Sequence, residues 1–489
     1  MGKVPHGFKG FSCRERAKKG RQSPVGRSAA PAAARRGFPA SRNDPVDLAD
    51  AYAKPRTRAG EQFGCRLKSG MTDSALDALP LFAQDCAVLA AATDGRSPSF
   101  ADLVEDFCQF GKPSAEAWEG SVRYLINEFW TSGQRQAHSL HEVSYRACFK
   151  AQLPAFFIDR LTAPGDAVYD PFMGRGTTPV QAALMGRRPI GNDINPLSIL
   201  LSRPRLAPPA LRDVARRLDQ IGWDDGKIDD ADLLAFYSER TLRHICALRG
   251  WLIERAPLDR APDPVDDWIR MVAINRLTGH SPGFFSVYTL PPNQAVSAVS
   301  QRKINARRGQ TPPDRDVKTL ILKKSASLLR DGPMAPHPPA LLTTGCAQAT
   351  PAIGSLSVQL VVTSPPFLDI VQYAEDNWLR SWFAGIDVAN VAIVQHRTEA
   401  GWQTMVRDTL GELARVVRPG GHVAFEVGEV RNGKVLLERL VWEAAEGLPF
   451  DRLFVMVNQQ EFTKTANCWG VRNNAKGTNT NRIVVLRRH

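Results

Sequence analysis

The sequence of 489 residues has no apolar stretch long enough to span a membrane and no apolar core of a secretory signal near its start. Its eight cysteines form no C-x-x-C pair, and none has a spacing to histidine that is typical of a zinc site. We therefore expect a cytoplasmic protein with reduced thiols, without a membrane segment and without a bound metal.

Positive charge is unevenly distributed along the chain. Of the formal net charge of +13, residues 1–70 contribute +11, from 16 Lys or Arg and 5 Asp or Glu. This head is rich in Gly, Pro, Ser, Ala and Arg without a periodic apolar pattern, so we expect a disordered basic extension. It could be a nonspecific DNA-binding arm or a targeting segment. A third interpretation is an upstream extension of the reading frame, with Met71 as the true start.

A second basic segment lies deeper in the chain. Residues 270–330 contain 11 Lys or Arg and only 2 Asp or Glu. Such a run is usually a solvated face, but its cations also suit the neutralisation of phosphates. The candidate DNA contacts are Arg302, Lys303, Arg307, Arg308, Lys323 and Lys324.

Short apolar segments separated by helical patterns indicate an α/β fold. The expected strands are 167–170, 189–192, 340–344, 358–363, 422–427, 453–458 and 482–487. This alternation predicts a doubly wound, mostly parallel, seven-stranded Rossmann-like sheet with ligands at the carboxyl ends of its strands. Within residues 72–135, the amphipathic stretches Phe100 to Phe110 and Trp118 to Trp130 predict a helical N-terminal layer.

A glycine-containing loop follows the first expected strand. Its sequence, D-P-F-M-G-R-G-T-T, covers residues 170–178. Gly174 and Gly176 permit positive φ and close backbone approach, and the helix that follows offers free N–H groups at its start. The third glycine of the nicotinamide-binding loop is missing. About twenty residues later a second strand ends in Asp193, where a ribose hydroxyl would need an acceptor.

A turn with two prolines follows the strand 358–363. The prolines hold the chain extended, so that the Ser364 hydroxyl and nearby carbonyls face one point. Such a point suits an exocyclic amine, whose delocalised lone pair becomes nucleophilic when its N–H groups donate hydrogen bonds. Phe367 can stack on the base, which contributes about 1–3 kcal/mol. The alternative interpretation is an ordinary proline-rich turn.

These motifs resemble those of the amino-group DNA methyltransferases, which modify N4 of cytosine or N6 of adenine with S-adenosylmethionine. The resemblance covers roughly residues 138–487, and T-S-P-P-F at 363–367 is the version associated with N4-cytosine enzymes. It implies a catalytic turn made of Ser364, Pro365, Pro366 and Phe367. It implies a cofactor site made of Tyr145, Asp170, Pro171, Phe172, Gly174, Gly176, Thr177 and Asp193.

Three positions qualify this resemblance. Family members usually carry an acid just before the catalytic strand, where this sequence has Cys346. Ser364 replaces an aspartate, so we expect the proton of the amine to leave to solvent. Tyr145 lies in a segment that closes over the methionine part of the cofactor in the family, although a docking helix with core aromatics is an alternative. The sequence has no Pro-Cys pair, which disfavours methylation of a ring carbon.

The resemblance implies a site-specific methyltransferase that acts on a flipped base of double-stranded DNA, most simply on N4 of cytosine. Alternatives are an N6-adenine enzyme, an RNA or protein amide methyltransferase, and a noncatalytic DNA-binding relative. A cognate restriction endonuclease is a possible partner. The expected domains are a basic extension (1–70), a helical N-terminal region (71–137), a cofactor-binding part (138–204), an inserted recognition region (205–339) and a catalytic part (340–489).

Overall fold

The computed structural model describes residues 98–131, 137–145, 148–258, 260, 262–289, 295–368, 376–392, 396–430, 435–459 and 480–489. The chain divides into two units, Met1–Thr72 and Asp73–His489. All described residues belong to the second unit, so the expectations for residues 1–70 and for the start at Met71 lie outside them.

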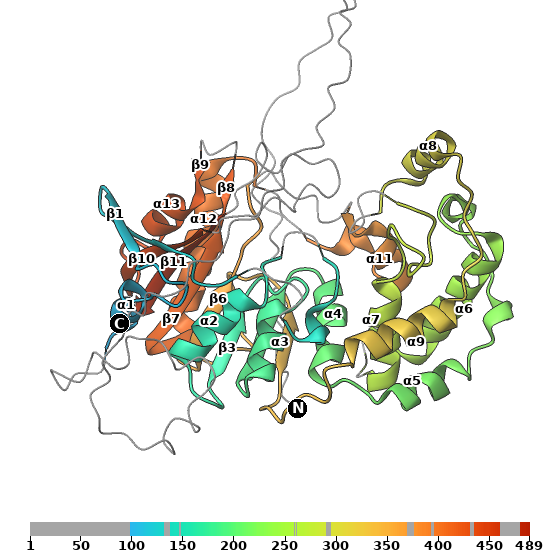
Figure 1. The fold of residues 1–489 in the computed structure, drawn as a ribbon, viewed down its shortest axis with the longest axis horizontal. Helices are drawn as coiled ribbons and strands as arrows, with labels where there is room; N and C mark the ends of the chain where they lie inside the picture. Colours follow the sequence, from blue (N-terminus) through green and yellow to red (C-terminus); the bar gives the residue numbers. More distant parts are fainter. Residues whose placement is uncertain are drawn as a thin grey trace, which may run out of the picture. The chain divides into compact units, whose positions relative to one another are not determined.

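One large sheet contains nine of the strands in the described residues, in the order β1-β2-β10-β11-β7-β6-β3-β4-β5 (Figure 1). Their bounds are β1 Ala115–Glu119, β2 Val122–Asn127, β3 Ala167–Asp170, β4 Arg188–Asp193, β5 Leu341–Thr344, β6 Val358–Thr363, β7 Val417–Val427, β10 Phe450–Gln459 and β11 Thr480–Arg488. Strands β5, β4, β3, β6 and β7 pair in parallel, whereas β11 is antiparallel to both of its neighbours. All seven expected strands are present, and the mostly parallel α/β fold is confirmed.

The two additional strands correct the expected helical N-terminal layer. Only α1 (Phe100–Glu105) is helical in the described part of that region. The apolar residues of the stretch Trp118 to Trp130 fit a strand because β2 buries Val122 and Tyr124, and β2 extends the sheet by pairing in parallel with β10. Gly120, at φ 62°, sits in the tight turn between β1 and β2, which favours a hairpin over a continuous helix.

Helices cover both faces of the sheet, as the alternation of side chains along buried strands requires. On one face Val168 and Leu360 pack with Phe157 of α2 (Gln152–Leu161). On the other face Tyr169 and Val361 pack with residues of α12 (Glu399–Val416) and α13 (Leu437–Ala444). The helix α3 (Thr177–Leu184) follows β3 and leads into β4. A small separate hairpin, β8 (Glu429–Val430) and β9 (Val435–Leu436), follows β7.

A helical region with its own apolar core is formed by the chain between β4 and β5 together with one helix, α11, that follows β6 (Figure 1). Its helices are α4 Leu197–Leu206, α5 Leu211–Leu218, α6 Glu239–Arg255, α7 Pro264–Ile274, α8 Ala298–Arg308, α9 Val317–Leu328 and α11 Trp378–Ala384. Short 3-10 helices are η5 Ser139–His141, η6 Trp223–Asp225, η7 Ala231–Ala235 and η8 Val388–Asn390. In the described part of the chain, no helix combines the length and apolarity that a membrane span needs.

Candidate active site at the carboxyl ends of β3 and β6

The two sequence motifs meet at one edge of the sheet. Strands β3 and β6 pair directly, with Val168 opposite Leu360, although they are far apart in the sequence. At their carboxyl ends the Thr363 hydroxyl donates a 2.6 Å hydrogen bond to the Asp170 carboxylate. The glycine loop that starts at Asp170 and the turn that starts after Thr363 are therefore held side by side.

Asp170 is a buried structural acid, with only 1% of its surface exposed. Its Oδ1 also accepts a 3.1 Å hydrogen bond from the Phe172 amide, so it shapes the start of the loop. Burial raises the pKa of Asp170 to about 7, although hydrogen bonds from Thr363, the Phe172 amide and Thr178 lower it. This carboxyl group therefore titrates near neutral pH.

The loop requires its two glycines. Gly174 and Gly176 have φ of 50° and 76°, in the left-handed region that side chains disfavour. A Cβ at position 176 would lie 2.7 Å from the Ser202 Cβ, so no side chain fits there. Gly176 is also the N-cap of α3, whose first backbone N–H groups face the loop.

Asp193 supports the loop from the end of β4. Its carboxylate accepts a 2.8 Å hydrogen bond from the Gly174 amide and a 2.9 Å hydrogen bond from the Asn195 amide. Burial raises its pKa, against the effect of these backbone donors. The Ser198 side chain is a third donor, and since a carboxylate has about four acceptor sites, the same group retains the capacity to accept a ribose hydroxyl.

Tyr145 is buried beside the glycine loop. A Cβ on Gly174 would lie 3.7 Å from the Tyr145 Cε1, which shows how closely the ring approaches the backbone. Within residues 138–157, η5 precedes Tyr145 and α2 begins at Gln152, so part of the segment is helical, as the alternative of a docking helix expected, but Tyr145 lies outside both helices. Tyr145 nevertheless belongs to an apolar core cluster, as that alternative expected of the aromatics.

Arg175 was not identified from the sequence, yet it connects the loop to the segment that contains Tyr145. It is 6% exposed and donates to the backbone oxygens of Val143 at 2.8 Å and Phe149 at 3.3 Å. Its Nε also donates to the Thr177 hydroxyl at 3.1 Å. The sequence signal for Arg175 was the presence of a charged residue between the two glycines of the loop.

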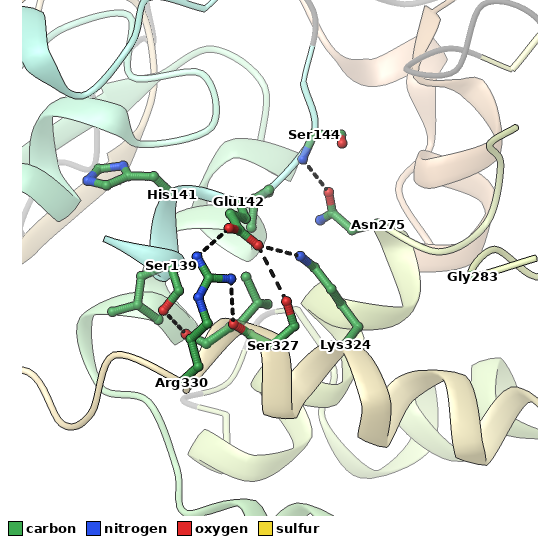
Figure 2. Close-up of polar contacts among 12 residues, drawn as sticks. Ser139, His141, Glu142, Ser144, Asn275, Gly283, Lys324, Ser327 and Arg330 are labelled. Atoms are coloured by element: carbon green, nitrogen blue, oxygen red, sulfur yellow. Dashed lines mark hydrogen bonds and ion pairs between the residues drawn. The ribbon is translucent and has the colours of Figure 1, made fainter. Parts of the chain in front are cut away.

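The helical region holds the same segment from the opposite side, as Figure 2 shows. Glu142 forms ion pairs with Arg330 at 2.6 Å and with Lys324 at 3.6 Å. The Ser144 amide donates to the Asn275 side chain at 2.9 Å. Residues 139–145 therefore connect the glycine loop to α7 and α9.

Lys324 differs in its environment from the other cations expected to contact DNA. Its side chain is 11% exposed, and burial lowers its pKa to about 8. The remaining candidates are exposed. Arg302, Lys303, Arg307 and Arg308 lie on α8, and Lys323 lies on α9.

Next to the turn that follows β6 lies a buried acid that was not identified from the sequence. The Ser364 hydroxyl hydrogen-bonds to the carboxylate of Glu426, which lies near the end of β7 and is 7% exposed. The Asn481 side chain at the start of β11 donates to the same carboxylate at 2.9 Å. Burial raises the pKa of Glu426, while Ser364 and Asn481 lower it. A single acid within the apolar strand 422–427 was the sequence signal.

The two prolines have different environments. The Trp402 indole donates a 2.8 Å hydrogen bond to the Pro366 carbonyl and so fixes the turn. None of the described residues donates to the Pro365 carbonyl. Ser364 donates to Glu426 and keeps its oxygen lone pairs, so it and the Pro365 carbonyl can both accept from one amino group. Phe172 and Phe367, half-buried, pack on the same apolar cluster.

Cys346 lies beside Asp193, after β5. The adjacent Gly345 amide donates to the Asp193 backbone oxygen at 2.9 Å, and the Asn192 side chain donates to the Gly345 carbonyl at 2.9 Å. The Cys346 thiol contacts the Gln348 side chain. The turn that carries an acid in the family is thus present here with a thiol.

Comparison with known proteins identifies one part of the chain. Residues 104–201 match the family described as DNA methylase. A curated relative, the type II methyltransferase M.MjaII of Methanocaldococcus jannaschii, is 40% identical over 72 residues. That match spans 15% of this chain and only 13% of the relative's length.

Solved structures with a similar arrangement are distant. TrmN from Thermus thermophilus has a TM-score of 0.28 and 12% identity, covering 72% of this chain and 52% of its own. A SAM-dependent methyltransferase from Methanosarcina mazei has a TM-score of 0.27 and 10% identity, covering 68% and 96%. The expected resemblance to amino-group DNA methyltransferases is therefore confirmed by the family and curated matches alone, and residues 104–201, with the glycine loop and Asp193, carry the DNA methylase signature.

Proposed function

We propose that this protein is an S-adenosylmethionine-dependent DNA methyltransferase that modifies the exocyclic amino group of a flipped base, N4 of cytosine in preference to N6 of adenine. The observation that carries the proposal is the junction of the two motifs. The hydrogen bond from Thr363 to Asp170 joins a glycine loop to a turn that offers two hydrogen-bond acceptors.

The residues of the loop fit the cofactor. Gly174 and Gly176 leave the backbone open to close approach, and the start of α3 offers N–H groups. Asp193 stands at the end of the adjacent strand with remaining acceptor capacity, and Tyr145 lies against the loop. S-adenosylmethionine supplies an electrophilic methyl group on a sulfonium sulfur when it is bound.

The catalytic turn orients the amino group of the target base. Flipping a base out of the duplex costs a few kcal/mol, which contacts inside the site must offset. Ser364 and the Pro365 carbonyl accept one N–H each, and Phe367 stacks on the ring, at about 1–3 kcal/mol. Holding the reacting atoms about 3–3.5 Å apart is the main contribution of such a site.

Glu426 gives the proton of the amine a destination within the protein. The sequence alone suggested release to solvent because Ser364 replaces an aspartate. Through its hydrogen bond with Ser364, Glu426 can accept that proton by way of the serine hydroxyl. Its raised pKa brings it closer to the operating pH, which favours this role.

The choice of target base rests on one turn motif, and the choice of DNA as substrate rests on one family match. Ser364 in the T-S-P-P-F turn supports cytosine, and N6 of adenine is the second candidate. The match of residues 104–201 to the DNA methylase family supports a DNA substrate over RNA or a protein amide. We further propose that the enzyme acts in the cytoplasm. We also propose that residues 205–339 recognise the target sequence and that a cognate restriction endonuclease is a partner of the enzyme.

The test is mass spectrometry of nucleosides from the DNA of a methylation-free host that expresses the full chain. We expect N4-methylcytosine, and none in a host that expresses S364A. N6-methyladenine would keep the mechanism and overturn the base. DNA without either product would overturn the DNA proposal, and parallel analysis of RNA and protein amides from the same cells would identify the alternative.

A further inference from the structure

Helix α8 is the most strongly basic helix of the helical region. Its eleven residues, Ala298–Arg308, include four arginines or lysines and no acidic residue. Few of its side chains are buried, namely those of Ala298 and Gln301. In Figure 1 it stands at the upper side of the view, the side to which the β8–β9 hairpin after β7 also points.

One side of α8 is fixed to the protein by polar contacts. The Gln301 side chain donates to the Tyr288 carbonyl at 3.1 Å, and the Asn305 side chain donates to the Ala235 carbonyl at 2.7 Å. The Arg308 guanidinium lies 3.9 Å from the centre of the Tyr288 ring. These contacts hold the helix in a defined orientation although it buries little apolar surface.

The opposite side carries Val299, Lys303 and Arg307, which we call the recognition stripe. Residues spaced by four lie on one side of a helix. Val299 is 57% exposed, and Lys303 and Arg307 are exposed as well. In the described part of the chain, neither Lys303 nor Arg307 forms an ion pair, whereas Arg302 on the flank pairs with Asp232.

We propose that the recognition stripe of α8 enters the major groove of double-stranded DNA and reads base edges, so that it determines the sequence at which the enzyme acts. This inference rests on the proposed function. The major groove admits an α-helix, Lys and Arg bind guanine O6 and N7, and a small apolar side chain contacts the thymine methyl group. In the stripe, Lys303 and Arg307 can make the guanine contact and Val299 the thymine contact, on a helix that has no acidic residue.

A phosphate-binding surface is the competing interpretation of the same cations. Removal of a phosphate contact weakens binding to all sequences about equally and lowers the salt dependence by about one unit. Base contacts instead change which sequence is preferred. The two interpretations therefore separate in an experiment that measures preference and affinity together.

The experiment selects duplexes from a randomised pool with the full chain and with K303A/R307A. We expect the variant to lose preference at one or two adjacent base pairs, with affinity for the original preferred duplex reduced about 10- to 100-fold. V299A should weaken preference for thymine at a neighbouring position. Because all three side chains are exposed, unchanged circular dichroism and melting temperature will show that the variants fold.

A matched control removes two cations elsewhere. Arg216 and Lys318 lie on α5 and α9, in exposed ion pairs with Asp213 and Asp219, and R216A/K318A should keep the preferred sequence. The same preference in K303A/R307A as in the wild type, or an equal loss on all duplexes, would overturn the inference. Failure of the wild type to select any duplex would also overturn it. A selected sequence without any methylated nucleoside would overturn the proposed function and leave the recognition stripe supported.

Discussion

The Thr363 hydroxyl lies 2.6 Å from the Asp170 carboxylate, and this one hydrogen bond joins the last residue of β6 to the last residue of β3. Both motifs depend on it, because Asp170 also accepts from the amide of Phe172 in the cofactor loop. A buried acid thus joins the glycine loop to the turn after β6, the two segments that the proposed reaction brings together.

The stability of the protein should report the titration of Asp170. Burial raises its pKa from 3.8 to about 7, so the folded state holds the proton more tightly than the unfolded state. Its contribution is most favourable at low pH and declines as pH rises through about 7. We expect the free energy of unfolding of the wild type, relative to D170N, to fall as pH rises from about 4 to about 7 and to level off above that. The slope should approach about 1.4 kcal/mol per unit.

Urea unfolding of both proteins at a series of pH values measures this difference. D451N is a suitable control because Asp451 is an exposed acid paired with Arg487. A constant difference between the wild type and D170N across this range would contradict the prediction.

Ser364 and Glu426 should act on turnover rather than on cofactor affinity. We expect S364A and E426Q each to lower kcat by about 10²- to 10⁴-fold, the range for positioned proton transfer, while calorimetry gives an unchanged Kd for S-adenosylmethionine. Since the ionised Glu426 is the acceptor, wild-type kcat should fall as pH drops below its raised pKa. In E426Q this acidic limb should disappear. Equal losses of kcat and cofactor affinity would indicate a structural role instead.

Gly176 should tolerate no side chain, for two separable reasons. Gly186→Ala is the matched control because Gly186 also has positive φ, 74°, but nothing lies within 4 Å of the Cβ position. G186A should cost about 1 kcal/mol from backbone strain alone. G176A adds the clash with Ser202, so its unfolding free energy should be lower still by about 1–3 kcal/mol. Equal stability of the two variants in urea would show that the loop relaxes.

Glu142 should couple the helical region to the cofactor loop. The hydrogen bond to Arg330 is the largest cause that holds the Glu142 pKa below its usual value, and electrostatic attraction to Lys324 lowers the pKa further. Its stabilisation is therefore present above the unfolded pKa and is lost as pH falls through the lower folded value. We expect E142Q to lower the melting temperature and to weaken S-adenosylmethionine binding, since residues 139–145 lead to Tyr145.

E239Q is the control for this variant, because Glu239 pairs with Arg243 in an exposed pair on α6. Such pairs contribute at most about 1 kcal/mol. An E142Q protein that binds S-adenosylmethionine as tightly as E239Q would exclude the coupling.

The sequence predicted the parts of the fold that repeat a simple pattern. All seven expected strands were located because buried strands read as apolar runs between turn signals. The β1–β2 hairpin was missed because Trp118 to Trp130 has apolar spacings that suit both a helix and a strand. The pairing of β2 with β10, which lies far along the chain, favours the strand over the helix.

The site was predictable where backbone geometry leaves a signature in residue type. Gly174, Gly176 and the two prolines are such residues, since no other types adopt their conformations as easily. Glu426 and Arg175 were not found because their roles come from tertiary contacts, with Ser364 in one case and Val143 in the other. Lys324 shows the converse, since a basic run in sequence does not reveal which of its members are buried.

The direct pairing of β3 with β6 has a consequence for how such a protein diversifies. The segment from α4 to α9 lies outside this pair, between β4 and β5. Mutations, insertions or exchanges in that segment do not change the spacing of the two motifs, because the pairing of β3 with β6 sets that spacing. Under the proposed function, exposed positions of α8 can therefore change and give a lineage new target sequences, whereas changes at Ser202, Asn275 or Lys324 would reach the glycine loop or the segment beside it.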